Sequence, residues 1–589
     1  MAHISMQGVG TDPASVVGKA PPVSEHTDIL VIGAGPAGLA AAMAAAGQGL
    51  RVTLVDENPV PFETMGEEVP LHFGGRMGRA AANRNAMLEQ MLETNPGLFD
   101  AVEAGIDVRL GTAAWGLFPR RSSAAWMDGD VVGLADGERA YLMGYRQVIV
   151  ATGRRDMGLA FPGWERPGVM GASAAHRLAI RYGALGAQEA VLLGSDSAAL
   201  QIGVALAQTG VRLLAVIEQG PQVLGDAGLL ATLVDQGARV FTRHVIRQAD
   251  GDENGVTAVS LVAVDEAGKH LPGPGVRLAC DTVLLGIAAV PAVELLEAAG
   301  CQVGYRAALG GHVPQLDAWQ RTSVPGMLAA GDCAGTWVAK SLSAEVAEAE
   351  GRRAAQAAVA SLLGGSPEST STDDQSVLSG TSLASSAASV PASTDLRATD
   401  SVATDAQASN AQDADTHSAD DTTDDTRCAW VRASVLEAEG VPHVCQCEEV
   451  TAAEILNVRP PRYLSWENAK VPVRDLVALA DGGAPHPDAV KRLTRAGMGP
   501  CQGRRCREQV GALLSVGAKV PIAQVPVASF RSPVRPLSLQ QMATLEQAPA
   551  LGEHWDSWFG MASQWVPFWK TPVQYTAASR ELNTPVASE

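Results

Sequence analysis

The sequence predicts an α/β fold in which two units of strand, helix and strand are followed by a small helical domain that carries paired cysteines. Three observations support this prediction. A short apolar run, Asp28–Ile32, leads through three glycines into an Ala-rich segment without proline and then into a second apolar run, Val52–Val55. The same order of elements recurs at Ala190–Glu218. Four of the eight cysteines fall together, between residues 445 and 506.

The first unit has the residues that bind a dinucleotide. Gly33, Gly35 and Gly38 have the G-x-G-x-x-G spacing directly after a strand. Gly33 turns the chain, Gly35 lets the backbone approach a pyrophosphate, and Gly38 lets helix and strand pack. Asp56 ends the second strand, where such a unit places a carboxylate for the adenosine ribose hydroxyls. A glycine-rich turn in some other α/β domain would not need all of these parts, so we expect a nucleotide site here.

The second unit departs from this pattern. Gly194 is present, but Asp196 and Ala199 stand at the second and third glycine positions, and Glu218 ends the unit. A carboxylate about 4 Å from a pyrophosphate charge costs about 4 kcal/mol per pair of charges near a protein surface. We therefore expect this unit to be retained as architecture and not to bind NAD(P). A tight dissociation constant for NADH or NADPH would contradict this expectation.

Composition restricts the class of protein. A chain of 589 residues is too long for one hydrophobic core, so several domains are expected. The net charge of −20 argues against nucleic acid or an anionic membrane as partner. No apolar run reaches the roughly eighteen residues of a transmembrane helix, and residues 1–25 lack the pattern of a signal peptide. Clustered cysteines are typical of metal or redox use in a reducing compartment, so we expect a cytoplasmic protein.

Two segments differ from the rest of the chain. Ser361–Arg427 consists mainly of Ser, Thr, Ala and Asp, which cannot bury enough apolar surface to fold, so it predicts a disordered linker. Gly552–Lys570 is rich in Trp and Phe in a chain otherwise poor in aromatic residues. This density is typical of an interface with a partner, although packing against the chain's own core is an equal alternative.

The late cysteines form two pairs, Cys445 with Cys447 and Cys501 with Cys506. Thr451 and Glu454 have the spacing of a capping box, which places the first pair just ahead of a helix. The second pair precedes or opens a helix at Arg507–Leu514. Four thiolates near helix N-termini suit a tetrahedral metal centre. Neither pair has the C-x-x-C spacing of zinc knuckles, but spacing alone leaves iron–sulfur and zinc both open.

Two further stretches carry a resemblance to a known family. Gln147–Gly153 (QVIVATG) and Thr322–Gly335 (TSVPGMLAAGDCAG) resemble the later FAD fingerprints of disulfide-reductase-like flavoproteins, which have two Rossmann-like dinucleotide domains. The resemblance implies FAD contacts from Thr152, Gly153, Gly331 and Asp332. In that family the Asp reaches the ribityl chain or the pyrophosphate region, whereas a helix-capping Asp is the alternative from local sequence alone.

The cysteine stretches, CQCEEVT and RAGMGPCQGRRC, resemble the bacterioferritin-associated-ferredoxin (BFD) type of [2Fe-2S] module. That module is fused to a flavoprotein in the large (α or A) subunits of opine oxidases and dehydrogenases, hydrogen cyanide synthase and hydroxyproline dehydrogenase. The sarcosine oxidase α subunit is a more distant relative. The exit segment SFRSPVRPLSL, Ser529–Leu539, belongs to the same resemblance. It implies that the cluster ligands are Cys445, Cys447, Cys501 and Cys506.

The resemblance also implies a function. The chain would be an electron-transfer subunit beside a β subunit of D-amino-acid or glycine oxidase type, which oxidises a small amine, opine or imino acid. An FMN at the subunit interface and a small ferredoxin-like γ subunit are further implications. Two alternatives stay open: a self-sufficient NAD(P)H-dependent reductase, and a scaffold subunit that keeps FAD, ATP or NAD as a structural nucleotide. No catalytic residue is expected on this chain.

This interpretation divides the chain into six parts. They are a flexible arm at 1–27, an FAD-binding domain at 28–155 and 320–364, a degenerate second Rossmann-like domain at 156–319, a disordered linker at 365–427, a BFD-like domain at 428–520 and a C-terminal extension at 521–589.

Overall fold

The computed structural model describes residues 22–23, 25–60, 84–121, 127, 129–365, 425–460, 476–480 and 483–546. Most of the predicted linker, residues 366–424, lies outside the described residues. So do the first 21 residues of the predicted arm and the aromatic segment Gly552–Lys570. None of the described helices is long and apolar enough to cross a membrane.

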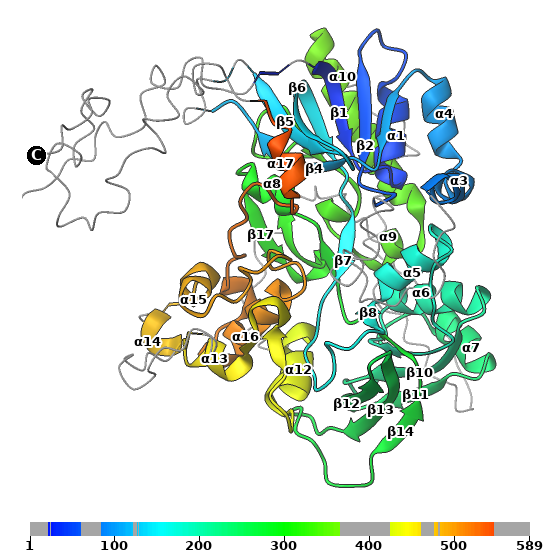
Figure 1. Ribbon diagram of the computed structural model, residues 1–589, viewed down its shortest axis with the longest axis vertical. Coiled ribbons are helices and arrows are strands. Elements are labelled where there is room, and N and C mark those ends of the chain that lie inside the picture. The colour runs from blue at the N-terminus through cyan, green and yellow to red at the C-terminus, as the bar shows by residue number, and fades with distance from the viewer. Residues whose placement is uncertain are drawn as a thin grey trace, which may run out of the picture.

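The first sheet, at the top of Figure 1, takes its strands from separate stretches of the chain. It consists of β1 (Glu25–Ile32), β2 (Val52–Asp56), β3 (Asp107–Leu110), β4 (Ala113–Phe118), β5 (Asp130–Ala135), β6 (Ala140–Val150) and β19 (Met327–Ala329). Their order is β3-β2-β1-β6-β5-β4, with β19 parallel to β6. β19 therefore brings the Gly331 turn to the end of the sheet where β1 and β6 also end.

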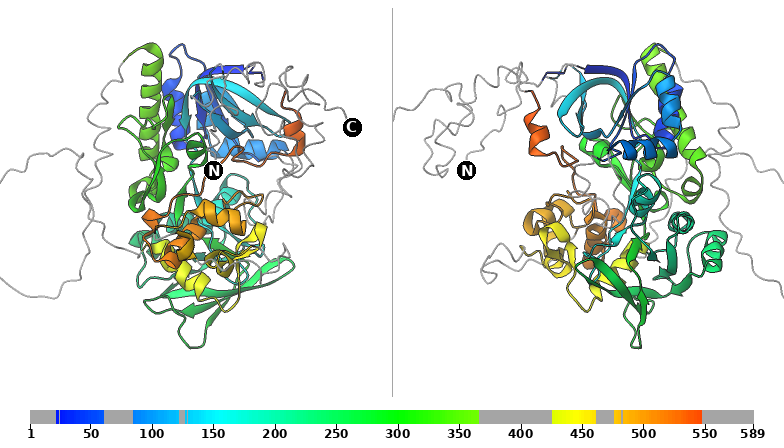
Figure 2. Two further views of the ribbon diagram at one scale, coloured as in Figure 1. Left: turned by 90° about the vertical axis from the view of Figure 1, so that its left-hand side faces the viewer. Right: turned by 45° about the vertical axis from the view of Figure 1, so that its right-hand side comes forward.

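Alternation along β1 explains how the two faces of this sheet are covered. Ile29 and Val31 face α1 (Pro36–Ala45) and α10 (Ala344–Leu363), which lie side by side in Figures 1 and 2. Leu30 and Ile32 face the other way, toward α8 (Glu294–Ala298). Beyond α1 lie α3 (Arg84–Thr94) and α4 (Gly97–Glu103). A Cβ at Gly351 of α10 would come within 2.0 Å of the Ala37 carbonyl oxygen, so glycine is required for α10 to lie this close to α1.

The second sheet has parallel strands in the order β11-β10-β9-β15-β8. These strands are β8 (Val169–Gly171), β9 (Glu189–Leu193), β10 (Arg212–Glu218), β11 (Arg239–Thr242) and β15 (Thr282–Leu285). The nearby helices are α5 (Ala172–Ile180), α6 (Ser197–Gln208) and α7 (Ala227–Asp235). A smaller antiparallel sheet lies below, made of β12 (His244–Asp252), β13 (Gly255–Ala263) and β14 (Val276–Ala279). Short pairs join β7 (Arg154–Asp156) to β16 (Ala289–Pro291) and β17 (Val303–Arg306) to β18 (Gly311–Pro314).

The cysteine-bearing region packs against the second sheet. Its elements are α12 (Thr426–Val431), β20 (His443–Cys445), β21 (Val450–Thr451), α13 (Ala452–Leu456), α14 (Leu476–Ala480), α15 (Pro487–Thr494) and α16 (Arg507–Ala518). Trp430 and Leu513 share one apolar core with Phe161 and Val191. The chain then returns to the first sheet and ends its described part with α17 (Leu539–Ala543) beside β4 and β5.

The strand expected to begin at Asp28 begins at Glu25, and the helix expected at Arg507–Leu514 extends to Ala518. The short helix α9 (Val338–Leu342) was not expected.

Candidate functional site

A cavity of about 320 Å³ opens where β1, β2 and β6 end. It is lined by five of the residues that the sequence assigns to a nucleotide site, namely Gly33, Gly35, Asp56, Thr152 and Gly153. Residues of α5 line another side, and two residues of the turn before α16 reach it from the cysteine region. The cavity thus lies where three parts of the chain meet.

Two of the three fingerprint glycines lie where the backbone requires glycine. Gly33 has φ +109°, and a Cβ there would lie 2.2 Å from the Ala151 carbonyl oxygen. A Cβ at Gly38 would lie 1.7 Å from the Gly33 carbonyl oxygen, so only glycine allows this turn to close. A Cβ at Gly35 would meet nothing within 4 Å, and Gly35 caps α1 without a side-chain hydrogen bond. The N-terminus of α1 therefore has no side-chain cap next to Gly35, which lines the cavity, as binding of a pyrophosphate there requires.

Asp56 holds the glycine turn as well as lining the cavity. Its Oδ2 accepts a hydrogen bond from the Ala34 backbone N–H at 2.7 Å. Its Oδ1 accepts hydrogen bonds from the backbone and the side chain of Asn58, each at 2.8 Å. Asn58 in turn accepts one from the Tyr182 hydroxyl at 2.6 Å. The carboxylate is thereby fixed at the end of β2, where the ribose hydroxyls of an adenosine bind in such units.

Asp332 is joined to the cavity through an arginine. Its Oδ2 lies 3.4 Å from Nε of Arg154, which lines the cavity, and Asp332 itself is in the turn after β19. The alternative role of Asp332, as the cap of the long helix, is wrong because Ser343 caps α10. The Thr152 hydroxyl donates to the Ala292 carbonyl oxygen at 2.8 Å, which ties the A-T-G turn to β16 and α8.

A buried ion pair beneath the Gly331 turn was missed by the sequence analysis. Nζ of Lys340 lies 2.7 Å from Oε2 of Glu350, and their side chains are 0% and 5% exposed. Lys340 also donates to the carbonyl oxygens of Gly331 and Gly335, at 2.8 and 2.9 Å, while Glu350 accepts from the Gly331 N–H at 2.8 Å. The helical spacing of Ala347, Glu350 and Ala354 could have placed Glu350 on the buried face of α10.

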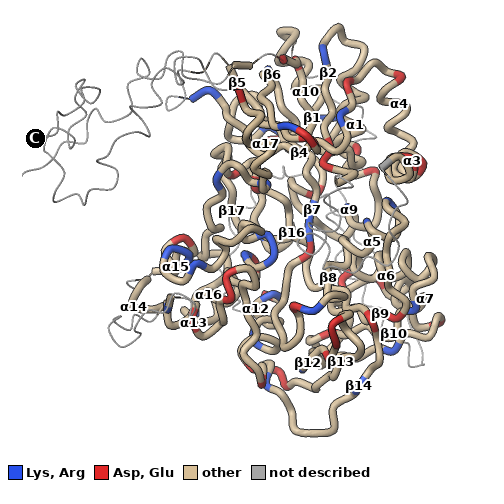
Figure 3. The backbone as a smooth tube through the Cα atoms, viewed as in Figure 1, with Lys and Arg blue, Asp and Glu red and all other residues tan. Residues whose placement is uncertain are grey.

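The cavity is rich in arginine although the protein is acidic. Basic residues are interspersed with acidic ones along the described chain (Figure 3). Seven arginines are among the described residues that line the cavity: Arg154, Arg155, Arg177, Arg181, Arg504, Arg505 and Arg535. Arg155 pairs with Glu294, and Arg535 pairs with Glu57. Burial lowers the pKa of Arg155 to about 9, so it still carries a charge at neutral pH. This cationic lining fits a ligand with several negative charges.

Asp156 is a buried acid in the same lining. It accepts hydrogen bonds from the hydroxyl and the N–H of Ser173, at 2.8 and 2.9 Å. Burial nevertheless raises its pKa to about 6, because removal from water disfavours the charged carboxylate.

In the second unit, the residues at the positions that would contact a nucleotide form hydrogen bonds within the protein. Asp196 caps α6 by accepting from the Ala199 N–H at 2.7 Å. Glu218 accepts from the Ser195 hydroxyl at 2.6 Å and from the Gly220 N–H at 2.9 Å. A Cβ at Gly225 would lie 2.7 Å from the backbone of this turn, so the chain itself covers it. A carboxylate therefore stands at the helix N-terminus where a pyrophosphate would bind.

The structure brings the four late cysteines together. The Sγ atoms of Cys447 and Cys501 are 3.4 Å apart, and further side-chain interactions join Cys445 to Cys447 and Cys506, and Cys501 to Cys506. We call these four residues the cysteine ring. The predicted capping box at Thr451 is confirmed.

Four cysteine thiols gathered on neighbouring turns are the donor chemistry of a thiolate-bound centre. The Sγ atoms of Cys447 and Cys501, at 3.4 Å, are closer than the roughly 3.8 Å expected for two thiolates on one tetrahedral ion with metal–sulfur distances of about 2.3 Å. As they stand the sulfurs touch one another, and no group of described His, Cys, Asp or Glu side chains encloses a metal-sized space. The other cysteines, Cys280, Cys301, Cys333 and Cys428, are buried and unbridged.

One turn belongs to both the cavity and the cysteine ring. Arg504 and Arg505 line the cavity, and they lie between Cys501 and Cys506 in the sequence. The Arg505 backbone is held close to the cavity wall, since a Cβ at Gly158 would lie 2.3 Å from its carbonyl oxygen. The guanidinium of Arg505 lies 5.3 Å from the centre of the Trp164 ring. A dinucleotide in the cavity and a centre on the cysteine ring would thus be neighbours.

Comparison with known proteins shows which proteins this chain resembles. The chain is 29% identical over 541 residues to the opine oxidase A subunit of Agrobacterium tumefaciens (strain Ach5), covering 90% of this chain and 94% of that protein. It is 30% identical over 295 residues to the sarcosine oxidase alpha subunit of Corynebacterium sp. (strain U-96), covering 49% of this chain and 29% of that protein. The fold resembles L-proline dehydrogenase from P. horikoshii, with a TM-score of 0.52 at 16% identity over 88% of this chain and 79% of that one.

A family model supplies the assignment. The model described as pyridine nucleotide-disulphide oxidoreductase matches residues 27–361, which contain the glycine turn, the covered second unit and the Gly331 turn. With these elements in place, the chain belongs to the pyridine nucleotide-disulphide oxidoreductase family of oxidoreductases.

Proposed function

We propose that this chain is the electron-transfer subunit of a heteromeric dehydrogenase or oxidase that acts on an amine, an opine or an imino acid. In this proposal FAD binds in the cavity and a [2Fe-2S] cluster binds to the cysteine ring. The observation that carries the proposal is the turn Cys501–Cys506, whose ends belong to the ring and whose middle lines the cavity. The division of the chain into FAD-binding, second Rossmann-like and BFD-like domains is part of it.

The residues of this chain hold and orient the two groups. A flavin supplies two-electron chemistry that can be delivered one electron at a time, which suits a one-electron cluster beside it. The Gly33 turn and Asp56 would hold the pyrophosphate and the adenosine ribose, and the cavity arginines would balance the negative charge. Cys445, Cys447, Cys501 and Cys506 would bind the iron.

A partner subunit is proposed as the site of substrate oxidation. The opine oxidase and sarcosine oxidase relatives are by name subunits of larger enzymes. We propose a β subunit of D-amino-acid or glycine oxidase type, which takes the hydride from the carbon next to nitrogen. A cytoplasmic location, an FMN at the subunit interface and a small γ subunit extend the proposal. This chain alone would then oxidise little or no substrate.

The alternative of a self-sufficient NAD(P)H-dependent reductase finds less support. It requires the second unit to bind a nicotinamide nucleotide, whereas Asp196 caps the helix there and Gly225 packs over the turn. The scaffold alternative predicts a bound nucleotide without redox activity.

Analysis of the purified full chain tests these proposals. We expect a coloured protein that releases FAD on denaturation, identified by chromatography, and that contains iron and acid-labile sulfide. Release of ATP or NAD in place of FAD would support the scaffold. Zinc in place of iron would contradict the cluster, and bleaching of the flavin by NADPH would support the reductase.

A further inference from the structure

The motif SFRSPVRPLSL has no role in the function described so far. After the last turn of the cysteine region, the 3₁₀ turn Ile522–Gln524, the chain crosses to the first sheet. Along the way the Phe530 N–H donates to Oε2 of Glu297 at 2.9 Å, and the Val534 N–H donates to the Trp115 carbonyl oxygen at 2.8 Å. We call residues 526–546 the C-terminal strap.

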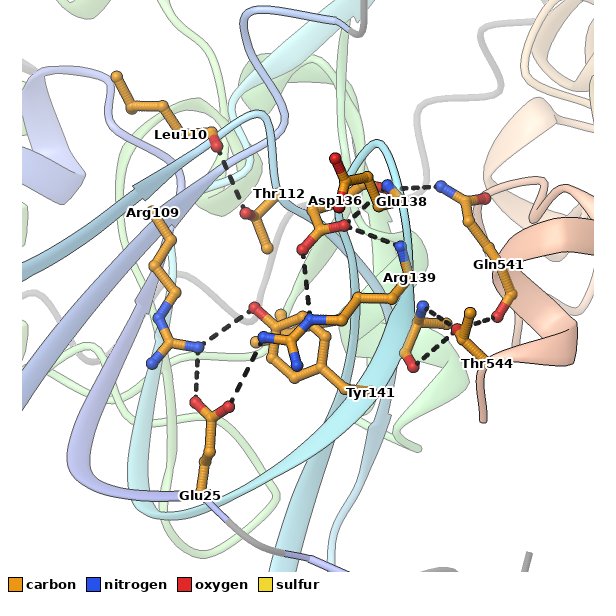
Figure 4. A network of polar contacts seen from close by, with 12 residues as sticks. Glu25, Arg109, Leu110, Thr112, Asp136, Glu138, Arg139, Tyr141, Gln541 and Thr544 are labelled. Atoms are coloured by element: carbon orange, nitrogen blue, oxygen red, sulfur yellow. Dashed lines mark hydrogen bonds and ion pairs between the residues drawn. The ribbon is translucent and has the colours of Figure 1, made fainter. Parts of the chain in front are cut away.

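The far end of the strap is anchored on the first sheet. Nε2 of Gln541 donates to the Asp136 carbonyl oxygen at 2.5 Å, and the Thr544 hydroxyl accepts from the Ala140 N–H at 2.9 Å. Figure 4 shows the side chains of Gln541, in α17, and of Thr544, just after it, turned toward the hairpin that joins β5 to β6. Leu537 and Leu545 pack on the small apolar cluster of this hairpin. The strap is therefore held on both sides of its middle.

The middle of the strap forms part of the cavity wall. Val534 and Arg535 line the cavity, and the Arg535 guanidinium pairs with Glu57. Asp56 lies near enough to act on Arg535 electrostatically, while burial lowers the pKa of Arg535 to about 10, so the guanidinium remains charged at neutral pH. The carboxylate at the end of the second strand marks the adenosine end of such a site. Arg535 is thus a largely buried cation at that end.

We propose that the C-terminal strap is part of the nucleotide site, and that Arg535 binds the adenosine half of the dinucleotide. A guanidinium offers a planar fork of donors to phosphate or ribose oxygens and a flat face to the base. The strap begins at the cysteine region and ends on the first sheet. When it is bound to both, it closes this side of the cavity. This inference depends on the proposed function only in that the cavity holds a dinucleotide.

Variants of the full chain test the role of Arg535. We expect Arg535→Gln to weaken flavin nucleotide binding about tenfold or more, since a charge-assisted contact is lost. Arg535→Lys should give an intermediate loss, because it keeps the charge without the planar fork. Arg531→Gln is the matched control, as Arg531 is exposed on the same strap. The readouts are nucleotide content after purification and the dissociation constant on refilling, with iron content and circular dichroism as checks of the fold.

A second variant tests the strap separately from Arg535. Gln541→Ala removes an anchor outside the cavity, and we expect several-fold faster release of the nucleotide with all cavity residues intact. If Arg535→Gln and Arg535→Lys bind the nucleotide as tightly as the wild type, the role of Arg535 is refuted. An unchanged release rate in Gln541→Ala refutes the closing role of the strap. A wild-type chain that carries no nucleotide would instead contradict the proposed function.

Discussion

The buried pair of Lys340 and Glu350 allows a quantitative prediction. In Lys340→Met, the Glu350 carboxylate would stay buried without its cation, and the carbonyl oxygens of Gly331 and Gly335 would each lose a donor. Breaking a buried ion pair in this way costs about 3–5 kcal/mol. Since native domains have only about 5–15 kcal/mol of stability, this is a large fraction of the total.

The expected effect of a double substitution separates the charge from the packing. Glu350→Gln keeps an acceptor for the Gly331 N–H and removes the buried negative charge. Lys340→Met combined with Glu350→Gln should therefore be less destabilised than Lys340→Met alone. Urea unfolding followed by circular dichroism measures the free energy of each variant. Flavin content should fall together with stability, because the pair supports the turn that carries Asp332.

An exposed pair on the same helix provides the control. Arg352 lies 3.5 Å from Glu348 on α10, and their side chains are 42% and 40% exposed. Arg352→Met should cost less than about 1 kcal/mol, as exposed pairs do. A loss in Lys340→Met no larger than this control would refute the reasoning, since it would mean that the Glu350 charge is not confined away from water.

Three further outcomes are expected. Cys447→Ser should abolish iron binding, measured by metal analysis and visible absorption, whereas Cys428→Ser, outside the cysteine ring, should not. Titration of the wild type with NADPH should show no saturable binding. Asp196→Gly should not create a binding site either, because Gly225 still covers the turn. A tight dissociation constant for NADPH in either protein would contradict this. Burial raises the pKa of Asp156 from 3.8 to about 6, so its stabilising contribution is complete below 3.8 and is lost as the pH rises through 6. Urea unfolding at pH 5 and 7.5 should therefore show a loss of about 1.4 kcal/mol in the wild type relative to Asp156→Asn, because only about one pH unit of the shift lies above pH 5.

Features with a local signal were predicted correctly from the sequence. The glycine turn depends on backbone geometry that only glycine allows at Gly33 and Gly38, so the spacing itself is diagnostic. The capping box at Thr451 and the helix after Cys506 are likewise set by adjacent residues. The replacement of the second fingerprint glycine by Asp196 could also be recognised in the sequence, because a carboxylate at that position would repel a pyrophosphate.

Features that depend on distant partners could not be predicted in this way. Glu57 and Arg535 form an ion pair although they are far apart in the sequence, and no neighbouring residue of either one indicates this pairing. The position of Arg504 and Arg505 on the cavity wall depends on how the cysteine region packs against the second sheet. Lys340 is a charged residue in the short helix α9, and it is buried because α6 and α10 both pack against that helix.

The contacts between the cysteine region and the rest of the protein favour a fixed distance between the cysteine ring and the cavity. Gln509, which is 1% exposed, accepts from the Ala160 N–H at 2.8 Å and donates to the Val444 carbonyl oxygen at 2.9 Å. The Trp164 indole donates to the His443 carbonyl oxygen at 2.8 Å. Leaving a buried polar group without a hydrogen-bond partner costs about 1–3 kcal/mol of folding stability. A shift of the cysteine region relative to the second sheet would break these bonds and is therefore unfavourable. Because Cys445 directly follows Val444, the same contacts hold the cysteine ring close to the cavity, as the proposed electron transfer between a flavin and a cluster would need.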